Sequence, residues 1–135
     1  MKEGNFVSEL FFGGALFEIV YFNYKYLGEA MPKGYWIVRG DVTDQQKYEA
    51  YIAANAKPLK KYGARFLIRA GRFENPEGTS RTRNAVIEFP TYQAALDCWN
   101  SPEYQAAIKL RIHVSTIDLV IIEGYDGPQP SQVSP

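Results

Sequence analysis

The chain has 135 residues, of which 46% are hydrophobic and 15% aromatic, and this size and composition suit one globular domain with a packed core. Its 15 basic side chains balance 15 acidic ones, which excludes a strongly basic protein that binds nucleic acid or acidic lipid through net charge. The single cysteine, Cys98, cannot form an internal disulfide, and no Cys/His grouping has the spacing of a zinc site. We therefore expect a cytoplasmic protein with no metal, no cofactor, and no nucleic-acid or membrane partner.

The first 30 residues contain the most apolar run of the sequence, Leu10 to Phe22. This run is shorter than the about 20 apolar residues that cross a bilayer, and it is interrupted by Glu18. A basic start and a small-residue cleavage site are missing, which argues against a secretory signal. We expect an appended arm over residues 1–30, or the product of an upstream start codon. Since five of the eight phenylalanines lie in this arm, its second half is expected to dock on the domain or on a partner subunit.

The predicted elements begin with a strand over residues 34–42, which is rich in aromatic and β-branched residues. Thr43 and Asp44 are good helix N-caps, and apolar residues then recur with helical spacing from Tyr48 onward. Gly63 is expected to end this helix. Alternation predicts a second strand over residues 64–73, and a turn-rich loop joins it as a hairpin to a third strand over residues 84–90.

Thr91 predicts the start of a second helix, which is interrupted by Ser101 and Pro102. Serine is a good N-cap and proline fits the first helical position, so a helix is expected to restart here and run toward His113. A fourth strand is predicted over residues 118–124, and the Pro-rich tail, residues 128–135, is expected to be disordered. The order of elements predicts an α+β, ferredoxin-like βαββαβ domain over residues 31–127, with helices on one face of a four-stranded antiparallel sheet.

The alternation within each strand predicts which side chains face the helices. Strict alternation directs Phe66 and Ile68 toward the helices, and Arg39, Arg69 and Glu88 toward the opposite face. That opposite face also carries apolar side chains: Tyr35, Ile37, Leu67 and Val86. Because this is more apolar surface than a monomer normally exposes in one patch, the sequence predicts a homodimer.

Five segments of the chain resemble, in order and spacing, the family called domain of unknown function 1330. They are KGYWIVRGDVTD, YGARFLIRAG, RTRNAVIEFP, NSPEYQAAIKLR and DLVIIEGYDG, within Met31 to about Gly127. The resemblance implies a subunit of the dimeric α/β-barrel superfamily, in which two sheets pack face to face. That superfamily includes cofactor-independent monooxygenases, haem-degrading enzymes, isomerases and non-enzymatic small-ligand proteins, so it implies no single reaction. Family members usually have Arg-Gly-Gly where this chain has Arg69-Ala70-Gly71.

Two polar residues are expected to point from the helices toward the sheet. Arg111 and Asn55 each lie seven residues after a tyrosine of a helical core stripe, Tyr104 and Tyr48 respectively. They predict a pocket in which an anionic or carbonyl ligand is oriented among aromatic side chains. The candidate ligand-binding residues are Arg111, Asn55, Tyr48, Tyr104, Trp36, Trp99, Arg39, Arg69 and Glu88. The alternative is a structural role, in which Arg111 pairs with Glu88 or Glu123 and Asn55 bonds to the backbone.

Three functional hypotheses follow from these residues. The first is a small-molecule-binding protein or cofactor-independent enzyme with an aromatic-lined pocket for a small acidic ligand, and no catalytic residue is assigned to it. The second is a non-enzymatic dimeric structural or interaction module. The third is haem-type oxidative chemistry, which needs an axial ligand, and the only histidine, His113, is expected to be exposed on the side of the helix opposite Tyr104. No glycine pattern that cradles phosphate is present, which argues against ATP or NAD.

Overall fold

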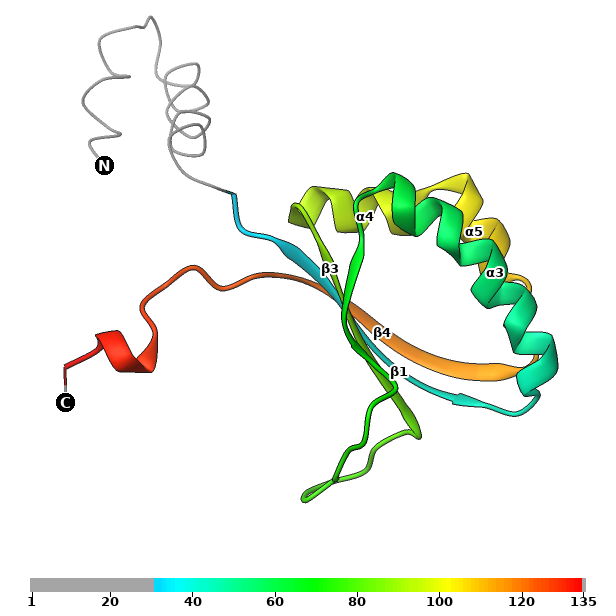
Figure 1. The fold of residues 1–135 in the computed structure, drawn as a ribbon, viewed down its shortest axis with the longest axis horizontal. Helices are drawn as coiled ribbons and strands as arrows, with labels where there is room; N and C mark the ends of the chain where they lie inside the picture. Colours follow the sequence, from blue (N-terminus) through cyan, green and yellow to red (C-terminus); the bar gives the residue numbers. More distant parts are fainter. Residues whose placement is uncertain (1–30, 135) are drawn as a thin grey trace, which may run out of the picture. The chain divides into compact units, whose positions relative to one another are not determined.

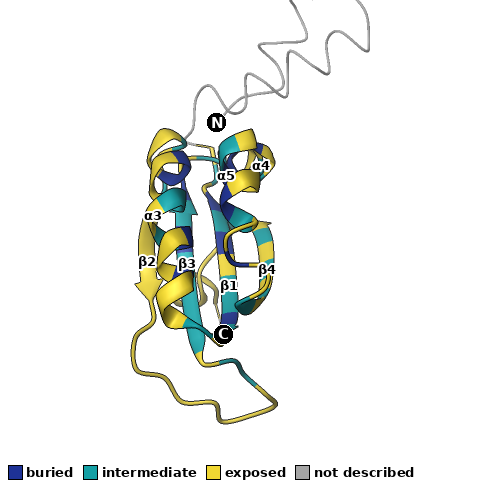
Figure 2. Ribbon diagram, turned by 90° about the vertical axis from the view of Figure 1, so that its right-hand side faces the viewer, coloured by how far each residue is buried: buried dark blue, intermediate teal, exposed yellow. Residues whose placement is uncertain are grey.

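The computed structural model describes residues 31–134; the arm predicted over residues 1–30 lies outside the described residues, as does Pro135. The described chain forms an antiparallel sheet with strand order β2-β3-β1-β4, and its α-helices lie together on one face of that sheet (Figures 1 and 2). The elements are β1 Gly34–Val42, α3 Gln45–Lys61, β2 Arg65–Arg69, β3 Arg83–Phe89, α4 Tyr92–Asn100, α5 Pro102–Ile108, β4 Ser115–Glu123 and a 3-10 turn, η1 Pro130–Gln132. This arrangement confirms the predicted α+β ferredoxin-like fold. None of the helices described is long and apolar enough to cross a membrane.

Short polar side chains begin the helices where the sequence predicts. Asp44 and Thr91 each accept a hydrogen bond from the backbone N–H three residues later, at 3.1 and 3.0 Å. Ser101 ends α4 and caps α5, because its hydroxyl accepts from the backbone N–H of Tyr104 at 3.2 Å. Gly63 follows α3 with φ of +76°, a conformation that favours glycine. These local signals are sufficient to set where most helices begin and end.

The second strand is shorter than predicted and contains a β-bulge. The register between β2 and β3 shifts between Phe66 and Ile68, so that β2 advances by two residues while β3 advances by one. The bulge reverses the alternation, and Arg69 therefore pairs with Ala85, on the face covered by the helices. The prediction that Arg69 points away from the helices and Ile68 toward them is wrong. The strand ends at Arg69 because Ala70 has φ of +54° and turns the chain into the loop of residues 70–82.

The helix predicted to run toward His113 ends earlier, at Ile108. The backbone N–H groups of Leu110 and Arg111 bond to carbonyls three residues earlier, at 2.9 and 3.0 Å. Such bonds form a tighter turn than an α-helix and lead directly into β4, which begins at Ser115. His113 lies in this turn and is exposed, as the sequence predicts.

The core between the helices and the sheet is built around Trp36, which is 1% exposed. Its ring centre lies 5.0 Å from that of Phe89 and 4.8 Å from that of Tyr104. The indole Nε1 donates a hydrogen bond to the carbonyl of Ala95 at 3.0 Å, so the buried N–H has a partner. This bond and the ring contacts hold α4 and α5 against β1.

The opposite face of the sheet is not covered by any described element and has an apolar centre. Cross-strand pairing places Ile37 between Val120 and Val86, and Ile68 on the other side of Val86. Ile37, Ile68 and Val120 are 39, 50 and 50% exposed. We call the surface formed by Ile37, Ile68, Val86, Val120 and Ile122 the outer face.

Candidate ligand-binding site

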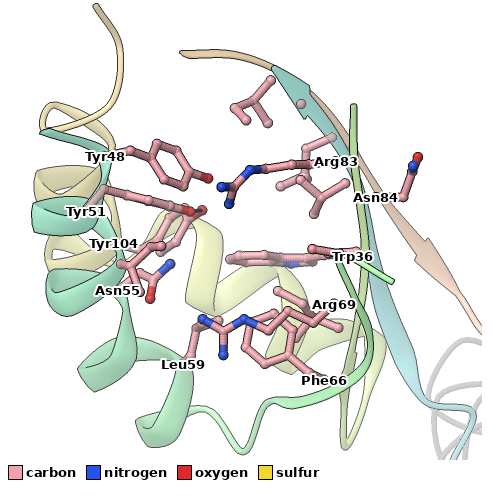
Figure 3. Close-up of a pocket in the computed structure, with 18 residues that line it drawn as sticks. Trp36, Tyr48, Tyr51, Asn55, Leu59, Phe66, Arg69, Arg83, Asn84 and Tyr104 are labelled. Atoms are coloured by element: carbon pink, nitrogen blue, oxygen red, sulfur yellow. Dashed lines mark hydrogen bonds between the residues drawn. The ribbon is translucent and has the colours of Figure 1, made fainter. Parts of the chain in front are cut away.

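A cavity of about 90 Å³ lies between α3 and the helix-covered face of the sheet (Figure 3). A single water molecule needs only about 10–15 Å³ of such space, so the cavity has room for a small organic molecule. Its walls are mainly aromatic and aliphatic, and no acidic side chain of the described residues lines it. The polar groups that reach it come from Tyr48, Tyr51, Asn55, Arg69, Arg83 and Tyr104.

The helix α3 supplies one wall of the cavity through a single helical face. Five residues of α3 line the cavity. Counted from Tyr48, the other four follow at offsets of three, four, seven and eleven residues: Tyr51, Ile52, Asn55 and Leu59. Helical spacing therefore places Tyr48 and Asn55 where the sequence predicts. Tyr51 belongs to the same stripe and was not among the candidates, although the same spacing would have identified it.

The sheet supplies two cations to the opposite wall. The guanidinium carbon of Arg69 lies 4.3 Å from the ring centre of Phe66, and that of Arg83 lies 5.3 Å from the ring centre of Tyr48. Both guanidinium groups point into the space between the sheet and α3 (Figure 3). Arg83 also donates a hydrogen bond to Gln45 at the start of α3. Sequence reasoning missed Arg83 because the third strand was predicted to begin one residue later, although the alternation continues back to it from Ala85.

Three tyrosine hydroxyls, from α3 and α5, contribute polar groups to the helical wall of the cavity. The hydroxyl oxygens of Tyr51 and Tyr104 are 2.6 Å apart, a short hydrogen bond between buried groups. Burial raises the pKa of Tyr104 well above its ordinary value, and the nearby Arg111 guanidinium opposes that rise. Burial also raises the pKa of Tyr48, and three guanidinium groups, led by Arg111, act in the opposite direction. At neutral pH Tyr48 and Tyr104 are therefore protonated and serve as hydrogen-bond donors.

Arg111 is buried, with 7% of its surface exposed, but it is not among the residues that line the cavity. Its guanidinium carbon lies 5.1 Å from the ring centre of Tyr51, in the range of a cation–π contact. Within residues 31–134 it has no carboxylate partner, and Glu88 accepts from Arg65 at 3.3 Å. The ion pair of Arg111 with Glu88 or Glu123 is thus absent, and the buried Nε has no hydrogen-bond acceptor.

The remaining candidates lie away from the cavity. Trp99 packs behind it, with its ring centre 5.9 Å from that of Trp36. Arg39 donates to the carbonyl of Thr79 at 2.8 Å, and Glu88 accepts from the Tyr35 hydroxyl at 3.0 Å, both on strand positions that face away from the helices. Five of the predicted candidates line the cavity: Trp36, Tyr48, Asn55, Arg69 and Tyr104.

Metal-ligating and nucleophilic side chains are sparse in the part of the chain that the structure describes. It contains no group of three or more His, Cys, Asp and Glu side chains placed to hold a metal ion. Cys98 is buried, and burial raises the pKa of its thiol to about 12, so it is not a thiolate at neutral pH. The exposed His113 does not line the cavity.

The family model described as "Domain of unknown function (DUF1330)" matches residues 33–125, which is more than half of the chain. This chain belongs to the DUF1330 family. No curated protein matches it significantly in sequence.

RPA0582 and SnoaB are two of the solved structures that resemble this DUF1330 protein. RPA0582, a protein of unknown function from Rhodopseudomonas palustris, has a TM-score of 0.57 and 15% identity, over 78% of this chain and 92% of its own. SnoaB, a cofactor-independent oxygenase from Streptomyces nogalater, has a TM-score of 0.52 and 13% identity, over 73% of this chain and 98% of its own. At such low identity the likeness establishes the fold alone, which is the ferredoxin-like arrangement of strands and helices.

Proposed function

We propose that this DUF1330 protein binds a small acidic organic molecule in the cavity between α3 and the sheet. The observation that carries the proposal is that Arg69 and Arg83 both reach an aromatic cavity that no acidic side chain of residues 31–134 lines. No carboxylate among residues 31–134 lies within ion-pair distance of either guanidinium. Unpaired cations beside low-dielectric walls attract an anion more strongly than the same cations in water do.

The neutral groups of the cavity favour a flat ligand with further polar atoms. Trp36 and Phe66 offer apolar surface, while Tyr48 and Asn55 offer hydrogen bonds from the opposite wall (Figure 3). Small-molecule sites commonly combine apolar walls with a few polar groups in this way. We therefore propose a carboxylate or another acidic oxygen near the arginines and an unsaturated body against the aromatic walls.

The outer face supports a second part of the proposal, which is that the protein is a homodimer. Its aliphatic side chains are contiguous across all four strands and about half exposed. A dimeric α/β barrel would cover them by packing two sheets face to face, and it would do so with a self-complementary interface. The alternative function, a dimeric interaction module without a ligand, uses the same face and gives the two cavity arginines only a structural role.

Ligand-induced stabilisation of the full-length protein separates these functions. We expect benzoate to raise the melting temperature of the wild type more than its neutral analogue benzamide does, because binding to the native state stabilises it. Arg69→Gln and Arg83→Gln should each weaken benzoate affinity by about ten- to a hundredfold, since a charge-assisted hydrogen bond contributes about 1.5–3 kcal/mol. Arg39→Gln is the matched control, because Arg39 lies on the other side of the sheet.

Two results would contradict the proposal. One is equal stabilisation by benzoate and benzamide, which would show that no cation recognises the ligand. The other is an equal loss of affinity in the Arg39 control and in the cavity variants. If none of a set of small acids shifts the melting temperature and the cavity variants change only stability, the interaction module is the better description.

A further inference from the structure

We infer that the buried Arg111 cation gives the hydrogen bond between Tyr104 and Tyr51 a single direction, and that the resulting hydrogen-bond chain presents the Tyr51 hydroxyl to the cavity as a donor for an oxyanion. This inference rests on the proposed function and adds a ligand class to it. The class consists of small phenols and enols, whose acidic oxygen carries negative charge when ionised. Tyr51 would contact that oxygen, and Tyr104 and Arg111 would act through Tyr51 as positioning residues.

The first step of the argument is the pair of hydroxyl groups. Tyr51 and Tyr104 both line the cavity, and their oxygens are 2.6 Å apart. A phenol has one proton, so only one member of the pair donates to the other. The proton of the second phenol is left for a third group, and the cavity lies beside both. The direction of the shared bond decides which tyrosine offers that proton.

Arg111 sets this direction. A guanidinium has donors and no acceptor, so it favours the orientation in which the lone pairs of a neighbouring oxygen face it and the proton of that oxygen points away. Arg111 is placed to act in this way, because its buried guanidinium lies beside the pair, 5.1 Å from the ring centre of Tyr51, and it also opposes the effect of burial on the pKa of Tyr104. Tyr104 then donates to Tyr51, and the proton of Tyr51 is free to donate into the cavity.

No carboxylate among residues 31–134 accounts for the buried position of Arg111. Only 7% of its surface is exposed, and its guanidinium carbon lies 5.1 Å from the ring centre of Tyr51. Its Nε has no hydrogen-bond acceptor among the described residues. An unpaired buried cation is costly unless a neighbouring group gains from it. Behind two linked phenols, the cation polarises both hydroxyls in the same direction and strengthens the terminal donor.

The other groups that face Tyr51 across the cavity act in the same sense. Arg69 and Arg83 come from the sheet, whereas Tyr48 is a neutral phenol beside Tyr51 on α3 (Figure 3). No acidic side chain of the described residues lines the cavity and would repel an anion. An oxygen that gains negative charge near Tyr51 is therefore stabilised by fixed donors that need no rearrangement.

The test uses para-nitrophenol as a probe, because the absorbance of its phenolate reports the ionisation of the bound molecule. We expect the pKa of the bound probe to fall by about one unit or more relative to the free probe, a shift of about tenfold in its ionisation constant. Tyr51→Phe should still bind the probe and lose most of that shift. Tyr104→Phe and Arg111→Met should lose it as well, although Arg111 does not touch the cavity.

Two further variants control this comparison. Tyr48→Phe removes a phenol of the same cavity that is outside the chain, and it should keep the shift. Arg111→Lys retains the cation and should restore a large part of the shift lost in Arg111→Met, which a purely structural role would not predict. If Arg111→Met does not fold, Tyr104→Phe decides the question, because it keeps the ring and removes only the hydroxyl.

The outcomes separate this inference from the proposed function. If the wild type binds the probe and Tyr51→Phe leaves the shift in the probe's pKa unchanged, the proposed hydrogen-bond chain is wrong, although ligand binding is confirmed. If Tyr51→Phe removes the shift in the probe's pKa but Tyr104→Phe and Arg111→Met do not, Tyr51 acts alone, and the proposed hydrogen-bond chain is again wrong. If benzoate stabilises the wild type as proposed but para-nitrophenol does not bind, this inference fails and the proposed function stands. If neither molecule binds, both fail.

Discussion

Replacing Ala70 with glycine should stabilise the protein. Ala70 has φ of +54°, in the left-handed region where the Cβ of an L-residue crowds the following carbonyl. That crowding costs roughly 1–2 kcal/mol, whereas glycine adopts the conformation freely. Glycine also gives the unfolded chain more freedom, which removes roughly 0.4–1 kcal/mol of the gain. The net expectation is a stabilisation of about 0.5–1 kcal/mol, or about 2–8 °C in melting temperature for a domain of this size.

Two glycines of the same loop provide matched controls. Gly78 has φ of +74°, and a Cβ added there would meet no atom within 4 Å, so Gly78→Ala isolates the conformational cost without a clash. We expect this variant to lose stability by a similar amount. Gly71 also has open space around an added Cβ and does not have a positive φ, so Gly71→Ala should leave stability unchanged or raise it slightly.

The measurement is thermal and urea unfolding of the full-length protein followed by circular dichroism. The reasoning is refuted if Ala70→Gly is no more stable than the wild type while Gly78→Ala is less stable. That combination would mean that the conformational cost exists in the loop but is not present at Ala70.

Three further predictions concern other parts of the molecule. Val120→Asp, at the centre of the outer face, should convert the proposed dimer to a folded monomer in light scattering, whereas an unchanged mass would place the interface elsewhere. Cys98 should not react with a thiol reagent at neutral pH until denaturant is added, because burial raises its pKa to about 12; rapid labelling of the native protein would contradict this. Hydrogen bonds from Thr82 and Arg81 lower the pKa of Asp41 below 3.8, so its contribution to stability is present above that pH and is lost as the pH falls through the lower, folded-state value. Asp41→Asn should therefore lose less stability than the wild type on acidification below about pH 4, as measured by urea unfolding across that range; an identical loss would contradict it.

Local signals in the sequence were enough to predict the order and type of the elements. Asp44, Thr91 and Ser101 cap the helices through backbone groups only three residues away, so the interactions that start each helix are visible within a few residues of sequence. The positions of Tyr48 and Asn55 on the cavity wall follow from helical spacing for the same reason.

Tertiary structure alone decided the chemistry of the cavity. Arg69 reaches it only because the register shift in β2 reverses the alternation, and a bulge depends on pairing with a strand more than ten residues away in sequence. Arg111 is buried behind Tyr51 although the helix ends three residues before it, at Ile108, so helical spacing did not determine its place. The sequence by itself determined the elements, because caps and periodicity act over short distances along the chain. The tertiary structure decided which charges lie near the same cavity, because that depends on strand register and on how the chain turns between elements.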